Sequence, residues 1–216
     1  MKNSKRSTNI PELVVITCPG ISPDEIPAII GMFEEGLQTL HLRKPGMNRA
    51  ETIRFLDQIP ETYHPGIALH QHYDITDNYT LKGIHLPEKA RKKKDAGTLI
   101  DIYRKKELSV STSFHATEAL LSCKADTFDY AFLSPVFDSI SKTGYGGRSF
   151  DLSGQELPFP VLALGGVTPE HIPTALQNGF SGIAVLGYIW NASSPVEAFR
   201  YLLEQYNKKS ELLRSR

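Results

Sequence analysis

Basic, hydroxyl and imidazole side chains gather in this sequence just beyond short apolar runs that have the character of β-strands. They are His41, Arg43, Lys44, His70, His72, His85, Ser111, Ser113, His115, Ser139, Ser141 and Lys142. Arginine binds phosphates and carboxylates through two parallel hydrogen bonds, and lysine contributes a point charge. Imidazole titrates near neutral pH and can transfer a proton. The set predicts a site for an anionic ligand, with His70, His72 and His115 as candidates for catalysis.

Glycines follow the last two apolar runs of the chain, as the pair Gly165-Gly166 and as Gly187. Glycine lets backbone N–H groups approach an anion closely, and the loops after strands 7 and 8 hold phosphate in many barrel proteins. The alternative is that these glycines only make tight turns between strands and helices. Their occurrence at both positions favours a phosphate-binding site.

A long, hydroxyl-rich segment spans residues 134–147 and contains Ser139, Ser141 and Lys142. Long loops in compact domains are usually functional, and many act as lids over a substrate. We therefore expect this segment to contribute hydroxyl groups and one cation to a bound diphosphate or substrate. An ordinary surface loop is the alternative.

His70 and His72 lie two residues apart, a spacing that puts both side chains on one face of an extended segment. A metal ion would need a third ligand, for which Asp74 and His85 are the nearby candidates. We interpret the pair as substrate contacts or as part of a polar wall, and we predict no metal site.

The elements that must position these residues alternate between short apolar runs and helical patterns. The runs typical of buried strands span 13–17, 39–42, 67–70, 83–86, 108–111, 130–133, 161–164 and 182–186. The first helical pattern begins with Ser22 and Glu25, which have the spacing of a capping box. Eight such units predict an α/β fold, a single-domain (β/α)8 TIM barrel with a shortened segment between strands 6 and 7. A doubly wound open sheet is the alternative.

The ends of the chain are polar, so we expect a flexible N-terminal tail over 1–10, the barrel over 11–207 and a charged C-terminal tail over 208–216. Equal numbers of basic and acidic residues, 24 each, argue against a nucleic-acid partner. The basic run 91–94 has no interleaved aromatic residues, and we interpret it as a solvated face. Without a signal-like start or a membrane-length apolar run, the sequence favours a cytoplasmic protein with no membrane partner.

Several short motifs follow one another in a particular order and spacing. They are His41-Leu42-Arg43-Lys44, Gly83-Ile84-His85-Leu86, Ser113-Phe114-His115, the segment from Ser134 to Lys142, Leu164-Gly165-Gly166-Val167 and Gly182-Ile183-Ala184-Val185. Together they resemble the thiamine phosphate synthase and thiazole tautomerase family, over most of the chain. The resemblance implies a (β/α)8 barrel of thiamine biosynthesis that binds phosphorylated pyrimidine and thiazole substrates, and it leaves a homodimer open.

The resemblance also implies roles for single residues. Arg43 stands where the synthase has its diphosphate-binding arginine, and His41 where a glutamine contacts the pyrimidine. The family lysine that follows the arginine is replaced by Pro45, and Lys44 lies one residue earlier. The family's other diphosphate contacts are matched by Ser113, Ser139, Ser141 and Lys142. Its thiazole-phosphate loops are matched by Gly165, Gly166 and Gly187.

The chain departs from the family at its magnesium ligands. The resemblance implies Mg²⁺ as a cofactor, but His70-Gln71 stands in place of an Asn-Asp pair, and Ala90 in place of an aspartate. Mg²⁺ prefers oxygen ligands and usually needs one or two carboxylates. The tautomerase branch carries a histidine after strand 6, where this chain has Pro135.

Three functions follow as hypotheses. The main one is a thiamine phosphate synthase-like transferase, which joins hydroxymethylpyrimidine diphosphate to thiazole phosphate and releases pyrophosphate. The second is a thiazole tautomerase-like isomerase, in which His70, His72 or His115 is the general acid and base. The third is a non-catalytic binder of a phosphorylated heterocycle. The fold alone does not choose among them.

Overall fold

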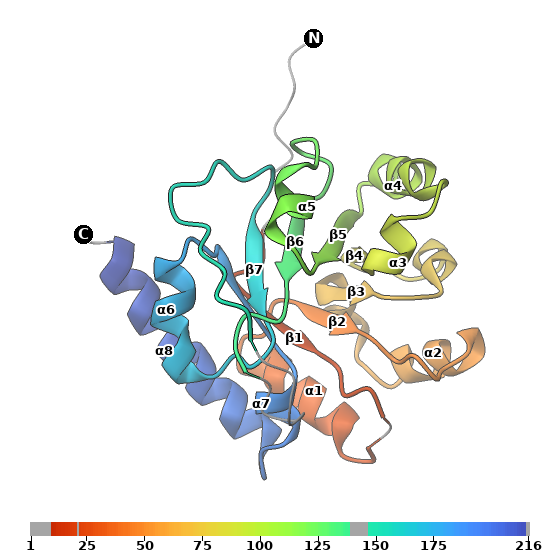
Figure 1. Cartoon of the computed structure of the whole chain (residues 1–216). Helices are drawn as coiled ribbons and strands as arrows, with labels where there is room; N and C mark the ends of the chain where they lie inside the picture. The colour runs from red at the N-terminus through yellow and green to blue at the C-terminus, as the bar shows by residue number, and fades with distance from the viewer. Residues whose placement is uncertain (1–9, 21, 139–146, 215–216) are drawn as a thin grey trace.

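Eight parallel strands close into a barrel in which each strand pairs with its sequence neighbours and β8 pairs with β1 (Figure 1). The computed structural model describes residues 10–20, 22–138 and 147–214. The strands are β1 (Leu13–Ile16), β2 (Leu40–Leu42), β3 (Ile67–Leu69), β4 (Gly83–Leu86), β5 (Ser109–Phe114), β6 (Tyr130–Leu133), β7 (Val161–Leu164) and β8 (Gly182–Val185). The expected (β/α)8 barrel is confirmed, and the open sheet is excluded because the sheet has no edge strand.

Helices cover the outside of the barrel. They are α1 (Glu25–Glu34), α2 (Arg49–Leu56), α3 (Glu88–Arg91), α4 (Ala96–Lys105), α5 (Thr117–Leu121), α6 (Ile172–Gln177), α7 (Gly187–Trp190) and α8 (Pro195–Arg214). Three short 3₁₀ helices add to them, at Glu61–Gly66, Tyr73–Asp77 and Pro169–His171. Within the described residues, none of the helices is both long and apolar enough to cross a membrane.

The described residues between β6 and β7, 134–138 and 147–160, form no helix and run as a loop in Figure 1, which agrees with the expected shortening. The last helix, α8, continues past the expected boundary at 207 and packs against α1, α6 and α7. Residues 208–214 therefore prolong this helix, where the sequence predicted a separate tail.

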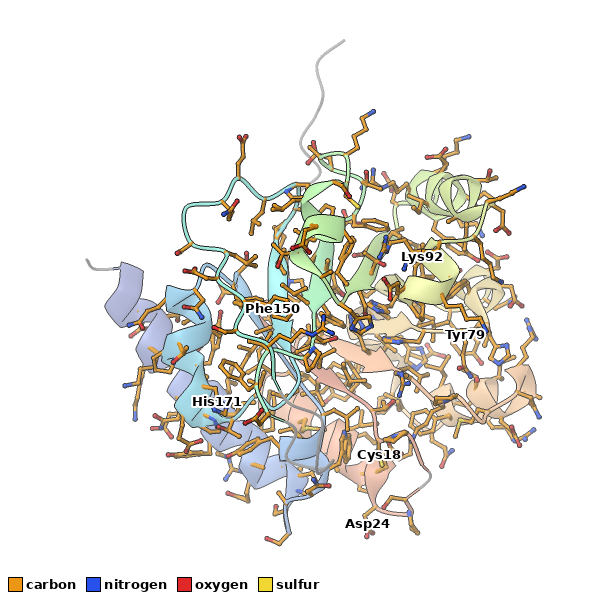
Figure 2. All side chains as sticks on the ribbon, in the orientation of Figure 1. Cys18, Asp24, Tyr79, Lys92, Phe150 and His171 are labelled. Carbon is orange, nitrogen blue, oxygen red and sulfur yellow. The ribbon has the colours of Figure 1, made fainter. Side chains whose placement is uncertain are left out.

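The start of α1 differs from the capping box predicted for it. The residue before the helix is Asp24, and it makes no side-chain capping bond. Glu25 turns inward, where it accepts a hydrogen bond from the backbone N–H of Cys18 at 3.1 Å and pairs with Lys44. Figure 2 labels Cys18 and Asp24, which lie on the connection between β1 and α1. The glutamate thus ties this connection to the end of β2.

The interior of the barrel has one apolar and one polar side. Apolar side chains inside the barrel come from β1, β6, β7 and β8, and they are Val14, Ile16, Phe132, Leu162 and Ala184. On the other side, β2, β4 and β5 place the polar residues His41, His85 and Ser111 inside, each at most 1% exposed. Barrel interiors are usually filled by branched apolar residues. A polar half needs hydrogen-bond partners, since an unpaired buried polar group is costly.

Candidate active site

A cavity of about 290 Å³ lies where the strands end at their carboxyl termini. Its described lining residues are Ile16, Arg43, His70, His85, Pro87, Glu88, Ser113, His115, Phe132, Ser134, Leu164 and Leu186. The structure therefore brings five of the residues singled out from the sequence, Arg43, His70, His85, Ser113 and His115, into one pocket. Active sites of barrel enzymes lie at this end of the fold.

His41 is fully buried and does not line this cavity, but it contacts His70, which does. Its Nδ1 is 2.9 Å from His70 Nε2, and its Nε2 is 2.6 Å from the hydroxyl of Tyr130. Burial lowers the pKa of both imidazoles well below the usual value, and the neighbouring His85 adds to the effect. The two rings are therefore neutral near pH 7, and the cavity floor offers hydrogen bonds rather than charge.

His85 occupies the next strand and is also neutral. Its Nδ1 lies 2.9 Å from Ser111 Oγ and its Nε2 lies 2.8 Å from Ser113 Oγ. The ring stacks on His70 with centroids 4.2 Å apart and on Phe132 at 5.0 Å. Burial, with a contribution from Arg43, lowers the pKa of His85 to about 3. The three rings thus pack face to face at the bottom of the cavity.

Glu88 supplies a carboxylate that the sequence reasoning missed. It opens α3, directly after β4 and Pro87, and that position beyond a strand end was the available signal. Its oxygens lie 2.9 Å from Lys92 Nζ and 3.9 Å from His115 Nε2. The hydrogen bond from Lys92 is the main cause of a lowered pKa of Glu88, so the carboxyl group is ionised. His115 is oriented by the Ser134 carbonyl oxygen, which accepts from its Nδ1 at 2.9 Å.

The donor set of the cavity does not fit a resident magnesium ion. Among its described lining residues, Glu88 is the one carboxylate, and it is already paired with a lysine. The other polar groups are imidazoles, hydroxyls and the Arg43 guanidinium, whereas Mg²⁺ prefers oxygen ligands with several carboxylates or phosphates.

Arg91 is a second cation beside the cavity, although the sequence suggested a solvated basic run. Its guanidinium lies 4.0 Å from the centre of the Phe114 ring and donates a long, 3.5 Å hydrogen bond to the Ser113 carbonyl. It is only 14% exposed, whereas Lys92 is 65% exposed. The first residue of the run thus packs against β5, and the next one, Lys92, which Figure 2 labels, is exposed.

Two residues expected in the site lie elsewhere. Lys44 is 2% exposed and forms a buried ion pair with Glu25, and its ammonium group also donates to the carbonyl oxygen of Gly20. The Nε2 of His72 lies 3.0 Å from the carbonyl oxygen of Met47. Among the residues described, neither lines the cavity.

Backbone angles and a close contact between two loops explain the glycines after β7, and the sequence alone did not show that contact. Gly165 and Gly166 adopt left-handed backbone angles, with φ of 97° and 66°. A Cβ at Gly166 would lie 2.2 Å from the carbonyl oxygen of Asp138, because the loop after β6 packs directly on this turn. The same loop is fixed by the stacking of Phe137 on His171, which is labelled in Figure 2.

Close approach of one loop to another and binding of a phosphate both need glycine at these positions. Gly187 begins α7, and the first N–H groups of a helix have no acceptor within the helix. The phosphate-binding role of the three glycines stays a prediction. Ser139, Ser141 and Lys142 lie outside the described residues.

The fold and the cavity define a single-domain (β/α)8 barrel with a polar, cationic pocket at the carboxyl ends of its strands. A sequence profile described as "Thiamine monophosphate synthase" matches residues 13–189. The chain belongs to this family, as the motifs indicated.

Individual relatives agree with this assignment. The chain is 29% identical to a thiamine-phosphate synthase of Chlorobium luteolum over 209 residues, which cover 93% of this chain and 95% of the relative. A thiamine phosphate pyrophosphorylase from Bacteroides thetaiotaomicron is 29% identical, with a TM-score of 0.69 over 91% of this chain and 98% of the other. A pyrophosphorylase from Pyrococcus furiosus shares the fold, with a TM-score of 0.72 at 20% identity over 92% and 96% of the two chains.

Proposed function

We propose that the chain is a transferase of thiamine biosynthesis, which joins hydroxymethylpyrimidine diphosphate to thiazole phosphate and releases pyrophosphate. The observation that carries the proposal is the convergence of Arg43, Ser113 and His115 on one cavity in a chain of this family. A cation suits the diphosphate, and hydroxyls and backbone N–H groups suit phosphate oxygens.

In this reaction the bond between the pyrimidine methylene carbon and the diphosphate oxygen breaks, and the electron pair leaves with pyrophosphate. The thiazole nitrogen supplies the pair for the new carbon–nitrogen bond. Negative charge grows on the leaving diphosphate, so a fixed cation aimed at it lowers the barrier. Arg43 is assigned this role. Ser139, Ser141 and Lys142 are proposed to complete the diphosphate contacts, and Gly165, Gly166 and Gly187 to hold the thiazole phosphate.

A specific observation favours the isomerase as the second candidate. The Nδ1 of His115 faces the Ser134 carbonyl, which leaves Nε2 on the side of Glu88, 3.9 Å away. An imidazole that is oriented at one nitrogen and faces a carboxylate at the other can serve as acid and base in proton transfer. Isomerisation of the carboxythiazole phosphate would use this pair.

The decisive experiment is incubation of the protein with thiazole phosphate and pyrimidine diphosphate, over a range of Mg²⁺ concentrations, with chromatographic detection of thiamine phosphate. We expect product, and a large loss of it in Arg43→Gln. Arg49→Gln is the matched control, because Arg49 forms an exposed ion pair with Asp74 outside the cavity. Absence of product at every Mg²⁺ concentration, with carboxythiazole phosphate isomerised, would favour the isomerase; substrate binding without either reaction would favour the binder.

Cellular placement and assembly complete the proposal. A cytoplasmic location agrees with a family that acts on small phosphorylated metabolites, and fractionation of the native cell tests it. The homodimer stays a prediction, which light scattering on the purified protein checks directly.

A further inference from the structure

Two consecutive hydrogen bonds lead from the buried interior of the barrel to the cavity. The Tyr130 hydroxyl lies 2.6 Å from His41 Nε2, and His41 Nδ1 lies 2.9 Å from His70 Nε2. Tyr130 and His41 are at most 1% exposed, whereas His70 lines the cavity. Within the described residues, His70 Nδ1 has no hydrogen-bond partner, so this nitrogen is available to a ligand.

The chemistry of Tyr130 sets the direction of these hydrogen bonds. A neutral imidazole carries its hydrogen on one nitrogen and accepts at the other, so both bonds must run in the same direction. Phenol is a stronger acid than neutral imidazole, and an imidazole nitrogen is a better acceptor than a phenol oxygen. The distance of 2.6 Å is shorter than N–H···O bonds usually are, and it is typical of an O–H donor. Burial raises the pKa of Tyr130, which keeps its hydroxyl protonated. Tyr130 is therefore the donor to His41.

This direction determines what His70 offers to the cavity. When Tyr130 donates to Nε2 of His41, that ring carries its hydrogen on Nδ1 and donates it to Nε2 of His70. His70 then carries its own hydrogen on Nδ1 and presents an N–H donor to a ligand. The reverse direction would leave His70 Nδ1 as an acceptor. Free histidine in water prefers the Nε2–H tautomer, so an Nδ1–H form at His70 is a property that the protein imposes.

The surroundings of His70 suit an uncharged ring better than a phosphate group. The cavity lining includes the apolar side chains of Ile16, Leu164 and Leu186. A phosphate oxygen carries charge, and in apolar surroundings it needs more donors than one imidazole N–H. Arg43 lines the same cavity, and its charge adds to the effect of burial in lowering the pKa of His70. The cavity thus offers a neutral donor for a ring nitrogen and, near it, a cation for an anionic group.

A metal site is the competing interpretation, because ligand nitrogens of His41, His70 and His85 lie within 4.8 Å of one another. The facing nitrogens of His41 and His70 are already hydrogen-bonded to each other, and both nitrogens of His85 lie within hydrogen-bond distance of serine hydroxyls. The rings of His70 and His85 are stacked with an angle of 21° between them, so their in-plane lone pairs do not converge on one point. These contacts favour hydrogen bonding over metal coordination.

We propose that Tyr130 is a positioning residue, which acts through His41 to hold His70 as a hydrogen-bond donor toward the ligand. The ligand class is an uncharged heterocycle with an unprotonated ring nitrogen, attached to a diphosphate. In the reaction proposed above this ligand is the pyrimidine substrate, and in this respect the inference rests on the proposed function. A ring protonated at that nitrogen is rejected, because it has no lone pair for His70 and Arg43 repels its charge.

The first test uses the protein alone, labelled with ¹⁵N so that side-chain correlations in NMR spectra report the tautomer of each histidine. We expect the Nδ1–H tautomer in both His41 and His70. Tyr130→Phe removes the first donor and should shift His70 toward the Nε2–H form. Tyr73→Phe is the matched control and should leave both tautomers unchanged, because its hydroxyl donates to the backbone carbonyl of His70 and not to a ring.

An Nε2–H tautomer at His70 in the wild-type protein would overturn the proposal, and this measurement needs no variant. Unchanged tautomers in a folded Tyr130→Phe protein would also overturn it. Stoichiometric binding of Zn²⁺ to the three imidazoles in calorimetry would do so in favour of a metal site.

The second test compares the affinities of three ligands by calorimetry. They are the pyrimidine diphosphate and two analogues, in each of which a CH group replaces one ring nitrogen. The wild-type protein should bind one of the analogues about 10-fold more weakly, because the His70 N–H then has no acceptor. This difference should vanish in Tyr130→Phe, whereas the affinity for pyrophosphate should not change. Equal affinities of the wild-type protein for all three ligands, or weaker pyrophosphate binding in Tyr130→Phe, would refute a donor to the ring.

The two proposals can fail separately, because the tautomers are measured without a ligand. Thiamine phosphate formation by a protein whose His70 has the Nε2–H tautomer would remove the donor and leave the transferase. An Nδ1–H tautomer at His70 that discriminates between the analogues, in a protein that forms no thiamine phosphate, would remove the transferase and leave the donor.

Discussion

Replacement of Lys44 by methionine tests whether this residue serves the fold or the ligand. Lys44 and Glu25 are 2% and 1% exposed, and their ion pair is closed off by the Gly20 carbonyl and the Cys18 N–H. Removal of one partner strands the other charge in the interior, which costs about 3–5 kcal/mol. In a chain of this length each kcal/mol lowers Tm by roughly 2–4 °C. Lys44→Met should therefore lower Tm by about 6–20 °C.

Equilibrium unfolding in urea, followed by circular dichroism, measures this change. The double variant Glu25→Gln/Lys44→Met should recover much of the loss, because it leaves no buried charge unpaired. Lys106→Met is the matched control. Lys106 pairs with Asp77 at the surface, where the two side chains are 38% and 54% exposed, and such pairs contribute about 0–1 kcal/mol.

Binding of pyrophosphate, measured by calorimetry, separates the two roles of Lys44. If Lys44→Met unfolds like the wild type but no longer binds pyrophosphate, the buried-pair argument is refuted and the diphosphate contact inferred from the sequence is correct. If the double variant is stable and still binds, Lys44 is part of the fold alone.

Three further outcomes are expected. Gly166→Val should abolish phosphate-ligand binding while the barrel stays folded, because its Cβ would lie 2.2 Å from the Asp138 carbonyl and displace the loop after β6; unchanged binding in calorimetry would contradict this. The free protein should show no tight Mg²⁺ binding in calorimetry, since its cavity offers one described carboxylate. Burial lowers the pKa of His85 to about 3 in the folded protein, whereas the pKa of an unfolded histidine is about 6.5. Below pH 6.5 the native state therefore binds fewer protons than the unfolded state. As the pH drops, His85 should lower the free energy of unfolding by about 1.4 kcal/mol per pH unit. Urea unfolding at several pH values should show that this free energy falls less steeply with pH in His85→Gln than in the wild type.

The sequence by itself determined the fold and the end of the barrel at which the site lies. Apolar runs such as 130–133 and 161–164 match β6 and β7 residue for residue, because a strand buried on both faces must be apolar throughout. Closure of eight parallel strands then brings the carboxyl ends of all strands to the same end of the barrel. Arg43, His70 and His115 could therefore be placed in one pocket without knowledge of any contact.

Only the tertiary structure decided what each of these side chains faces. Arg43 and Lys44 are neighbours in sequence, yet one lines the cavity and the other is buried against Glu25, since successive side chains on an extended segment leave on opposite sides. The approach of Tyr130 to His41, 89 residues away, depends on strand register around the closed barrel, which no local pattern encodes. Periodicity fixes which positions are buried, but the partners of a buried polar group come from distant strands, and packing alone brings them together.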